Sequence, residues 1–314
     1  MKVSVKVPAT TANFGSGFDC FGMALPLYNI ITIEETVLPG TGVDVNVISD
    51  FQNNESFAIE HIPKDENSLI YKSVEMLYNS IGQSPSELKI TIKSSIPIAK
   101  GLGSSASIIV GGLYAANELL NKPADEAAIL SIATELEGHP DNVTPAIVGG
   151  FVITSLEEDG SIIYRKINWP QDWILNICIP DYELVTEISR SVLPVEVPIK
   201  DAVFNAGRTA MFIEALHTQD ADLMKYALQD KLHQPYRSKL VPGLDEIVSN
   251  LRHEEDVLGC TLSGAGPAIC VISLKNKVDK VKSVVSEIWE NYNVKTSVYS
   301  FKPELNGAEV IEVV

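Results

Sequence analysis

Apolar and polar residues alternate along several short segments in the first part of the chain, and this pattern predicts β-strands. Residues 88–93 read LKITIK, with leucine or isoleucine at every second position, as in a half-buried strand. Valine alternates in the same way in residues 2–8, so we expect a strand there that ends at Pro8. Residues 27–36 and 42–48 are two further strand candidates.

Elsewhere the apolar residues recur at helical spacing. Residues 106–120 carry apolar side chains along one helical face. Asn67 is a candidate N-cap for a helix over residues 68–82. A third helix is predicted from Pro123, because proline suits the first turn, to Gly138, because glycine is typical of helix ends.

The second half of the chain begins with a group of strand patterns. These patterns cover residues 151–155, 161–167 and 173–180. A turn at residues 158–160 joins the first two, and we expect the chain to change domain in this hairpin, which gives domains 1–160 and 161–314. The remaining predicted elements are helices over 198–217, 220–229, 243–255 and 278–293, and strands within 257–274, 294–301 and 308–314.

A glycine- and serine-rich loop, PIAKGLGSSAS, connects the strand at 88–93 to the helix at 106–120. Gly101 and Gly103 can adopt backbone angles closed to other residues and let a ligand approach the main chain. Ser104 or Ser105 can cap the helix. The first amides of a helix have no partner within it, and the helix dipole is positive there, so the loop predicts a phosphate site.

Two other loop patterns compete with this interpretation. Residues 101–106 also fit the dinucleotide pattern G-x-G-x-x-A. That fold needs a parallel strand after the helix, whereas here Pro123 and a second helical stretch follow, and the strand before the loop alternates. The Walker pattern fails because no Gly-Lys-Ser/Thr follows the loop. A plain strand-to-helix connection remains an alternative for the loop taken alone.

Composition narrows the classes of function. The chain has 314 residues, 45% of them hydrophobic and 21% charged, which is enough for two globular domains. Its formal net charge of −17 argues against nucleic acid and anionic membranes as partners. The N-terminal residues have no apolar signal core, and the four cysteines have no paired metal spacing, so we expect a cytoplasmic protein with reduced, mostly buried thiols.

Two other segments concentrate candidate chemistry. Residues 8–22, PATTANFGSGFDCFG, have the small residues and glycines of a loop. Glu135 and Glu137 lie at a predicted helix end, where a negative charge meets the negative pole, so a cation partner would make better sense of one of them. Residues 139–142, HPDN, have the composition of a turn.

These segments together resemble the GHMP kinases, the family of galactose, homoserine, mevalonate and phosphomevalonate kinases. Residues 97–107 resemble the phosphate-binding motif of the family, and residues 263–267, SGAGP, resemble its third motif, which closes against the other two. Residues 8–22 resemble the first motif of the homoserine kinases. The resemblance covers essentially the whole chain and implies an α+β fold of two domains, the first like ribosomal protein S5 domain 2 and the second ferredoxin-like, with ATP and substrate in the cleft between them.

The resemblance also implies a reaction and its cofactors. L-Homoserine and ATP would give O-phospho-L-homoserine, a step in threonine biosynthesis, with Mg²⁺ bridging Ser105 and Glu137 and a homodimer as the expected assembly. Phosphoryl transfer depends mainly on alignment and charge stabilisation, which suits these residues. The nucleotide-binding residues would be Asn67, Pro97, Ile98, Ala99, Lys100, Gly101, Leu102, Gly103, Ser104, Ser105, Ala106 and Ser107.

In the substrate pocket, Asp19 would bind the ammonium group, with Asn13 orienting the substrate backbone. Arg190 and Arg237 would hold the carboxylate through forked hydrogen bonds, although an arginine just outside a helix, as Arg237 is expected to be, is ordinarily a solvated surface residue. The substrate-binding residues would be Asn13, Asp19, His139, Asp141, Thr186, Arg190 and Arg237, and the catalytic residues Asn142, Glu137 and Ser105.

No general base is evident in this set. An amide such as that of Asn142 cannot act as one, and homoserine kinases lack the catalytic aspartate of mevalonate kinases, so the hydroxyl proton would pass to phosphate or water. Whether Asp141 assists stays open. One alternative function is that of another small-molecule GHMP kinase, acting on mevalonate or a sugar, which would not need Asp19 with two arginines. The other is a non-catalytic relative that binds ATP or a metabolite, and the intact Glu137 and serines argue against it.

Overall fold

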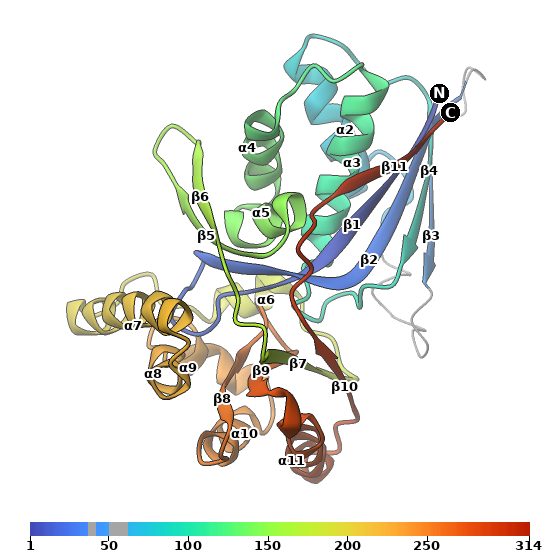
Figure 1. Cartoon of the computed structure of the whole chain (residues 1–314). Helices are drawn as coiled ribbons and strands as arrows, with labels where there is room; N and C mark the ends of the chain where they lie inside the picture. Colours follow the sequence, from blue (N-terminus) through green and yellow to red (C-terminus); the bar gives the residue numbers. More distant parts are fainter. Residues whose placement is uncertain (37–41, 50–61) are drawn as a thin grey trace.

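The computed structural model describes residues 1–36, 42–49 and 62–314, which form two sheets with their helices (Figure 1). The first sheet, as far as it is described, has seven strands in the order β11-β1-β2-β4-β3, with β5 paired to β2 and β6 to β5. All pairs are antiparallel except β3 with β4. The strands are β1 (Lys2–Ala12), β2 (Phe21–Glu35), β3 (Val43–Ser49), β4 (Leu88–Ser94), β5 (Phe151–Leu156), β6 (Ile162–Ile167) and β11 (Glu309–Val313).

Within the described residues, four helices pack together on one face of this sheet, beside β1 and β2 (Figure 1). They are α2 (Leu69–Ser80), α3 (Ser104–Leu119), α4 (Glu126–Glu137) and α5 (Pro140–Val148). The predicted alternation in β4 is confirmed, since its residues are buried at every second position. Ile31 and Ile33 of β2 and Ile109 and Leu113 of α3 belong to the same buried core, so α3 is held directly on the sheet.

The second sheet has the strand order β10-β7-β9-β8, and all its pairs are antiparallel. With helices after its first and third strands, this order is that of the ferredoxin-like β-α-β-β-α-β unit, which confirms the predicted second domain type. The strands are β7 (Trp173–Pro180), β8 (Val257–Leu262), β9 (Ile269–Leu274) and β10 (Thr296–Phe301); the helices are α6 (Thr186–Ser191), α7 (Ile199–Thr218), α8 (Ala221–Ala227), α9 (Gln234–Arg237), α10 (Leu244–Arg252) and α11 (Val278–Asn291).

A cluster of aromatic side chains joins the two halves. Phe14 and Phe151 come from the first half and Phe212 from α7, with ring centroids 5.5 to 6.0 Å apart. Trp173 of β7 belongs to the same buried core. These rings fix the relation between the two sheets, and they lie next to the turn that follows β1, where predicted substrate residues are placed.

The boundary predicted at residue 160 stays a prediction, but the sheets do not divide there. β6 lies beyond residue 160 and pairs with β5 in the first sheet. β11 also returns to the first sheet, where it pairs with β1 (Figure 1). The hairpin of β5 and β6 was predicted from the turn between them, whereas the pairing of β11 with β1 joins opposite ends of the chain, which local patterns do not reveal.

The strand predicted to end at Pro8 is longer than expected. β1 continues to Ala12, and the register with β2 shifts between Pro8 and Ala9. A proline cannot donate a ladder hydrogen bond, and such an irregularity accommodates it within a strand. Five residues of the predicted loop 8–22 therefore belong to β1, and its last two, Phe21 and Gly22, belong to β2.

Several helix starts also differ from prediction. Ser68, not Asn67, caps α2, because its hydroxyl accepts from the amide of Tyr71. Asp125 caps α4, so this helix begins after Pro123. Gly103 is the N-cap of α3, without a serine side-chain cap. Residues 139–142 are not a turn but the start of α5, where proline occupies the first turn. Among the described helices, none has the length and apolarity needed to cross a bilayer, and all four cysteines are free.

Candidate active site

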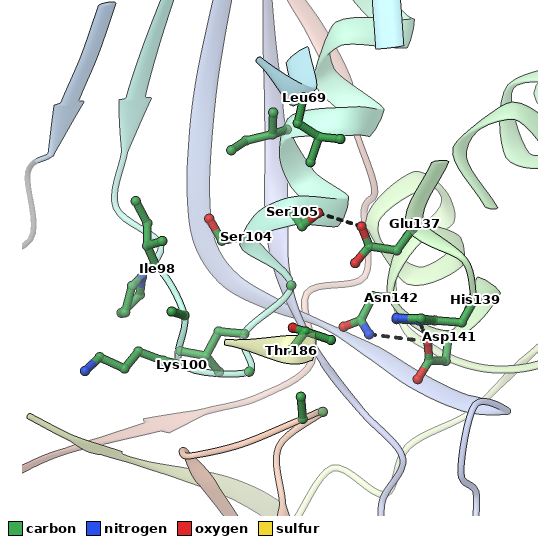
Figure 2. A pocket seen from close by; sticks show the side chains of 18 of the residues that line it. Leu69, Ile98, Lys100, Ser104, Ser105, Glu137, His139, Asp141, Asn142 and Thr186 are labelled. Carbon is green, nitrogen blue, oxygen red and sulfur yellow. Dashed lines mark hydrogen bonds and ion pairs between the residues drawn. The ribbon is translucent and has the colours of Figure 1, made fainter. Parts of the chain in front are cut away.

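A cavity of about 270 Å³ lies where the start of α3, the start of α5, the turn after β1 and helix α6 meet (Figure 2). Most of the residues predicted for a site line it. They are Asn13, Asp19, the nine residues from Pro97 to Ser105, Glu137, His139, Asp141, Asn142, Thr186, Arg190 and Arg237. Three predicted residues do not line it: Asn67 is exposed and bonds to Asp65, while Ala106 and Ser107 are buried behind the loop.

The two glycines of the phosphate-type loop are required by protein contacts. Gly101 has φ +75°, and a Cβ there would lie 2.2 Å from the carbonyl oxygen of Ser263. Gly103 has φ +66°, and a Cβ there would lie 1.8 Å from the hydroxyl of Thr10. Ligand approach to the main chain stays a prediction, and in the structure atoms of Ser263 and Thr10 already lie close beside these glycines. Any larger residue would separate the loop from its neighbours.

The loop is held against two other segments. The amide of Thr10 donates to the carbonyl of Leu102, at 3.1 Å, and the hydroxyl of Ser263 donates to the carbonyl of Gly101, at 2.7 Å. Ser263 also bonds the hydroxyl of Thr11, at 2.8 Å. The expected closure of residues 263–267 against the loop and the first segment is therefore confirmed.

The N-terminus of α3 opens onto the cavity without a cap. The first intrahelical bond runs from the amide of Ser107 to the carbonyl of Gly103, so the amides of Ser104, Ser105 and Ala106 have no partner within the helix. No acidic residue occupies the first turn. These amides and the helix dipole can bind an anion such as phosphate.

Lys100 does not direct its charge to this anion site. Its ammonium donates to the carbonyl of Tyr182, at 2.6 Å, and Figure 2 shows the chain extended away from Ser105 and Glu137. Burial lowers the pKa of Lys100, although Glu183 and Asp181 oppose this effect. Lys100 lines the cavity, and its ammonium group connects the loop to Tyr182 in the second half of the chain.

Ser105 and Glu137 are 32 positions apart in the sequence, and their side chains meet at the N-terminus of α3. The Ser105 hydroxyl donates to Oε2 of Glu137, at 2.6 Å (Figure 2). The packing of α4 against α3 brings them together. A hydroxyl and a carboxylate beside an anion site are the oxygen donors that Mg²⁺ prefers, so this pair fits the predicted metal. Glu135, the other acid at the end of α4, is exposed.

The environment of Glu137 has a consequence for stability. Burial raises its pKa, against the lowering effects of the His139 charge and the Ser105 hydrogen bond. A carboxyl whose folded pKa exceeds its unfolded pKa stabilises the fold fully below the unfolded pKa, and this contribution is lost as pH rises through the folded pKa. At neutral pH, where the carboxyl is ionised in the unfolded chain, Glu137 therefore opposes folding in the absence of a cation.

We expect Glu137→Gln to unfold at a higher temperature than the parent near neutral pH in a chelator, because the neutral amide avoids the burial of charge. The difference should vanish at acidic pH, where Glu137 is protonated in both states. Thermal unfolding at the two pH values measures this, and Glu135→Gln, on the same helix but exposed, should show no such gain. A Glu137→Gln protein that is less stable near neutral pH would contradict the argument.

The start of α5 carries a hydrogen-bonded group of polar residues. Asn142 accepts from the Thr10 hydroxyl through Oδ1, at 2.8 Å, and donates to Asp141 through Nδ2, at 3.3 Å. Asp141 is buried and also bonds Nδ1 of His139 (Figure 2). Burial lowers the pKa of His139, but the charge of Asp141 and the hydrogen bond to it outweigh burial, so the pKa is raised overall. Asp141 is thus engaged by a readily protonated imidazole.

The turn after β1 places Asp19 beside an arginine. Asn13 and Asp19 both have positive φ, 74° and 53°, which these two residue types tolerate better than most. Asn13 fixes the turn, because its Oδ1 accepts from the amide of Asp19 and its Nδ2 donates to the carbonyl of Gly264. The carboxylate of Asp19 receives both Nη groups of Arg190, at 2.8 and 3.2 Å. The fork predicted for a substrate carboxylate is thus occupied by Asp19.

Arg237 is not the solvated surface residue that its place at the end of α9 suggested; it is 1% exposed. Its Nε donates to the carbonyl of Ser189, and its Nη1 donates to Nδ1 of His233 and to the carbonyl of Gly264. Within the described residues, Nη2 has no hydrogen-bond acceptor, although the residue lines the cavity. Burial and the nearby Arg190 lower its pKa to about 10, so Arg237 is charged at neutral pH.

The structure adds residues that the sequence did not single out. Thr10 orients Asn142, and its place in the PATTAN segment was the available signal. Apolar side chains line the cavity beyond the loop: Ile62, Pro63, Leu69, Ile70, Ile92 and Ile108. These side chains form an apolar surface on which a flat organic ring can pack. In the sequence they could not be distinguished from core residues. Thr186, at the start of α6, lines the cavity as predicted.

Comparison with known proteins gives a consistent result. Residues 68–150 match the family described as GHMP kinases N terminal domain, and residues 212–291 match GHMP kinases C terminal. The chain is 44% identical to a homoserine kinase of Caldicellulosiruptor saccharolyticus, over 87% of this chain and 85% of that one. It is 40% identical to a homoserine kinase of Aquifex aeolicus, over 96% and 98% of the two chains.

Solved structures agree with these matches. The crystal structure of homoserine kinase from Cytophaga hutchinsonii superimposes with a TM-score of 0.85 at 28% identity, and the match covers 99% of this chain and 97% of that one. The two-domain fold predicted from the motifs is thereby confirmed. The chain belongs to the GHMP kinase family, on the branch of the homoserine kinases.

Proposed function

We propose that this protein transfers the γ-phosphoryl group of ATP to the side-chain hydroxyl of L-homoserine, giving O-phospho-L-homoserine for threonine biosynthesis. The observation that carries the proposal is one cavity with two chemically different ends. At one end an uncapped helix N-terminus adjoins the Ser105–Glu137 pair. At the other end Asp19, Arg190 and Arg237 line the same cavity, and the two N–H groups of Nη2 of Arg237 have no acceptor among the described residues. The names of the relatives point to the same reaction.

The first end suits a nucleotide. The free amides of Ser104, Ser105 and Ala106 would bind the phosphate oxygens. Ser105 and Glu137 would hold Mg²⁺, which when bound supplies positive charge that draws electron density from the phosphate groups. The apolar side chains at the entrance, such as Leu69 and Ile108, would pack against the base.

The second end suits the zwitterion of an amino acid. Asp19 and Arg190 now neutralise each other through a bidentate pair. An α-ammonium would take the place of Arg190 beside Asp19, and an α-carboxylate would bind the released Arg190 and Nη2 of Arg237. Opposite charges exchange for opposite charges, so neither side chain is left unpaired in the complex. Mevalonate and sugars lack the ammonium that this exchange requires.

Alignment of the hydroxyl falls to Asn142. Thr10 and Asp141 fix both ends of its amide, which leaves one N–H of Nδ2 for the substrate. Asp141 is paired with His139, and the raised pKa of His139 favours the imidazolium. The carboxylate of Asp141 is therefore a poor acceptor for the hydroxyl proton. The proton would pass to the transferred phosphate or to water.

We expect Asn142→Ala to lower turnover without adding or removing an ionisation in the pH–rate profile, because the residue positions the hydroxyl and does not titrate. Asp141→Asn should keep turnover within about tenfold of the parent, since His139 engages the carboxylate. Steady-state kinetics across a pH series measures both. A loss of about 10²–10⁴-fold in Asp141→Asn, together with loss of the acidic limb, would identify Asp141 as the general base and contradict this account.

The function is tested by coupled ADP release over a panel of homoserine, mevalonate, galactose and shikimate. Homoserine should be turned over with the highest kcat/KM; a clear preference for another alcohol would overturn the substrate, and ATP binding without turnover of any would favour the non-catalytic alternative. We place the reaction in the cytoplasm, which the four free cysteines support. The homodimer implied by the family resemblance also remains part of the proposal, and light scattering in solution tests it.

A further inference from the structure

His233 is fully buried and lies four residues before Arg237, at the N-cap position of α9. The carboxylate of Asp230 fixes the backbone around it by accepting from the amides of Leu232, His233 and Gln234, at 2.9, 2.9 and 2.6 Å. Asn205 of α7 donates to the same carboxylate, at 2.8 Å. The imidazole is therefore carried by a rigid turn anchored to a long helix.

The hydrogen bonds of the ring determine which nitrogen carries the proton. An arginine can only donate, so Nδ1 of His233, 3.3 Å from Nη1 of Arg237, must accept and has no proton. The proton of the neutral ring then lies on Nε2, which donates to the carbonyl of Gly15, at 2.9 Å. Burial lowers the pKa of His233, and Arg237 adds to this, against the opposite effect of Asp230. The ring is neutral in the physiological range.

The same ring contacts the turn that carries Asp19. His233 stacks on Phe18, with centroids 5.1 Å apart and planes 21° apart. The guanidinium of Arg237 lies 5.2 Å from the centroid of that phenylalanine. One imidazole thus contacts the arginine, the aromatic residue next to Asp19 and the backbone of Gly15.

His233 has a special place among the groups that hold Arg237. Of the five N–H groups of a guanidinium, three bond to Ser189, Gly264 and His233. Ser189 and Gly264 contribute backbone carbonyls, which belong to elements that also shape the cavity. The acceptor from His233 is a side-chain atom, and because the guanidinium is planar, the groups that bond Nε and Nη1 also fix the direction of Nη2.

We propose that His233 is a positioning residue for the substrate-binding arginine: its unprotonated Nδ1 orients Arg237 so that Nη2 faces the cavity, while its Nε2–H ties this orientation to the turn that carries Asp19. The part that concerns substrate rests on the proposed function. Both ends of the substrate zwitterion would then be read by groups whose relative placement depends on one imidazole.

Two substitutions separate the two nitrogens. In His233→Asn, the amide oxygen can take the place of Nδ1 as acceptor for Arg237, and the bond to Gly15 is lost. In His233→Gln, the longer amide can reach Gly15 as donor, and the acceptor for Arg237 is lost. His217→Gln, an exposed histidine of α7, is the matched control.

We expect His233→Gln to raise the KM for homoserine about tenfold or more, with little change in kcat or in the KM for ATP, because a hydrogen bond to a charged group is lost. His233→Asn should lie within about threefold of the parent. In an Arg237→Ala background, His233→Gln should add less than about twofold, since the partner is already absent. The inference is wrong if His233→Gln keeps the KM of the parent for homoserine while His233→Asn raises it. It is also wrong if the two variants change this KM equally or leave it equally unchanged.

A second measurement is made on the parent protein and needs no substrate; variants serve only to assign its signals. Long-range ¹H–¹⁵N correlation of the labelled parent at neutral pH reports the protonated nitrogen of each histidine, and the His233 signal is assigned by its loss in whichever of the two variants folds, or by elimination against variants of the other four histidines. A proton on Nε2 is expected; a proton on Nδ1 would overturn the inference. If the tautomer is as expected but homoserine is not phosphorylated by the parent, it is the proposed function that fails.

Discussion

Replacing Glu137 by glutamine is expected to lower turnover by about 100-fold or more while the fold stays intact, because Mg²⁺ would lose its charged protein ligand. In the parent, the Ser105 hydroxyl donates a hydrogen bond to Glu137, at 2.6 Å. The amide oxygen of glutamine can accept the same hydrogen bond, so the local packing is retained. Coupled kinetics at increasing Mg²⁺ measures the effect. The apparent Mg²⁺ requirement should rise as kcat falls.

The control for this result is on the same helix. Glu135 also lies at the negative end of α4 but is exposed, so Glu135→Gln should turn over like the parent. If Glu137→Gln remains within about twofold of the parent at saturating Mg²⁺, Glu137 is not the ligand. Asp141, which also lines the cavity, would then become the candidate.

Much of the fold follows from local patterns, and its exceptions have physical reasons. Alternation in residues 88–93 predicted a strand because one face of β4 packs on helices and the other does not. The end of β1 was misplaced because proline in a strand usually marks an edge or a bulge, and here the register with β2 shifts at Pro8. The return of β11 to β1 joins segments from opposite ends of the chain, which no local pattern encodes.

The site shows the same division. Ser105 and Glu137 were paired by resemblance, and the structure places them in contact because α3 and α4 pack side by side. The glycines were predicted for backbone angles closed to other residues, which their positive φ values confirm, and the structure adds a second reason: Ser263 and Thr10 occupy the space that a side chain would fill. A sequence shows that a position needs glycine without showing what approaches it.

Burial of Arg237 could not have been predicted from its neighbours in the sequence. Its acceptors come from Ser189, His233 and Gly264, on three different elements. The histidine is four residues away, a spacing that predicts contact in a helix, but α9 itself is too short to produce a recognisable period. These acceptors also modify the forked contact expected from Arg237. Nε and Nη1 bond to the protein, and only the two N–H groups of Nη2 remain for a ligand.

Arg237→Ala is expected to raise the KM for homoserine by roughly 30-fold or more and to leave the KM for ATP nearly unchanged. Removal of one partner of a buried charged pair commonly costs ~2–5 kcal/mol, and each ~1.4 kcal/mol is tenfold. ATP should be unaffected because the nucleotide would bind at the start of α3, on the other side of the cavity. Arg165→Ala, an exposed arginine of β6, is the matched control.

Two further measurements decide whether Arg237 reads a carboxylate. Arg237→Lys should recover only part of the loss, because an ammonium cannot bond Ser189, His233 and Gly264 while still presenting N–H groups to the substrate. L-Homoserine amide keeps the hydroxyl and the ammonium but lacks the carboxylate, so it should be a poor substrate for the parent and nearly indifferent to Arg237→Ala. Thermal unfolding of each variant separates loss of binding from loss of fold. If the amide is phosphorylated as well as homoserine, or if Arg237→Ala weakens ATP and homoserine equally, then Arg237 does not recognise the α-carboxylate, and another hydroxyl substrate fits this cavity better.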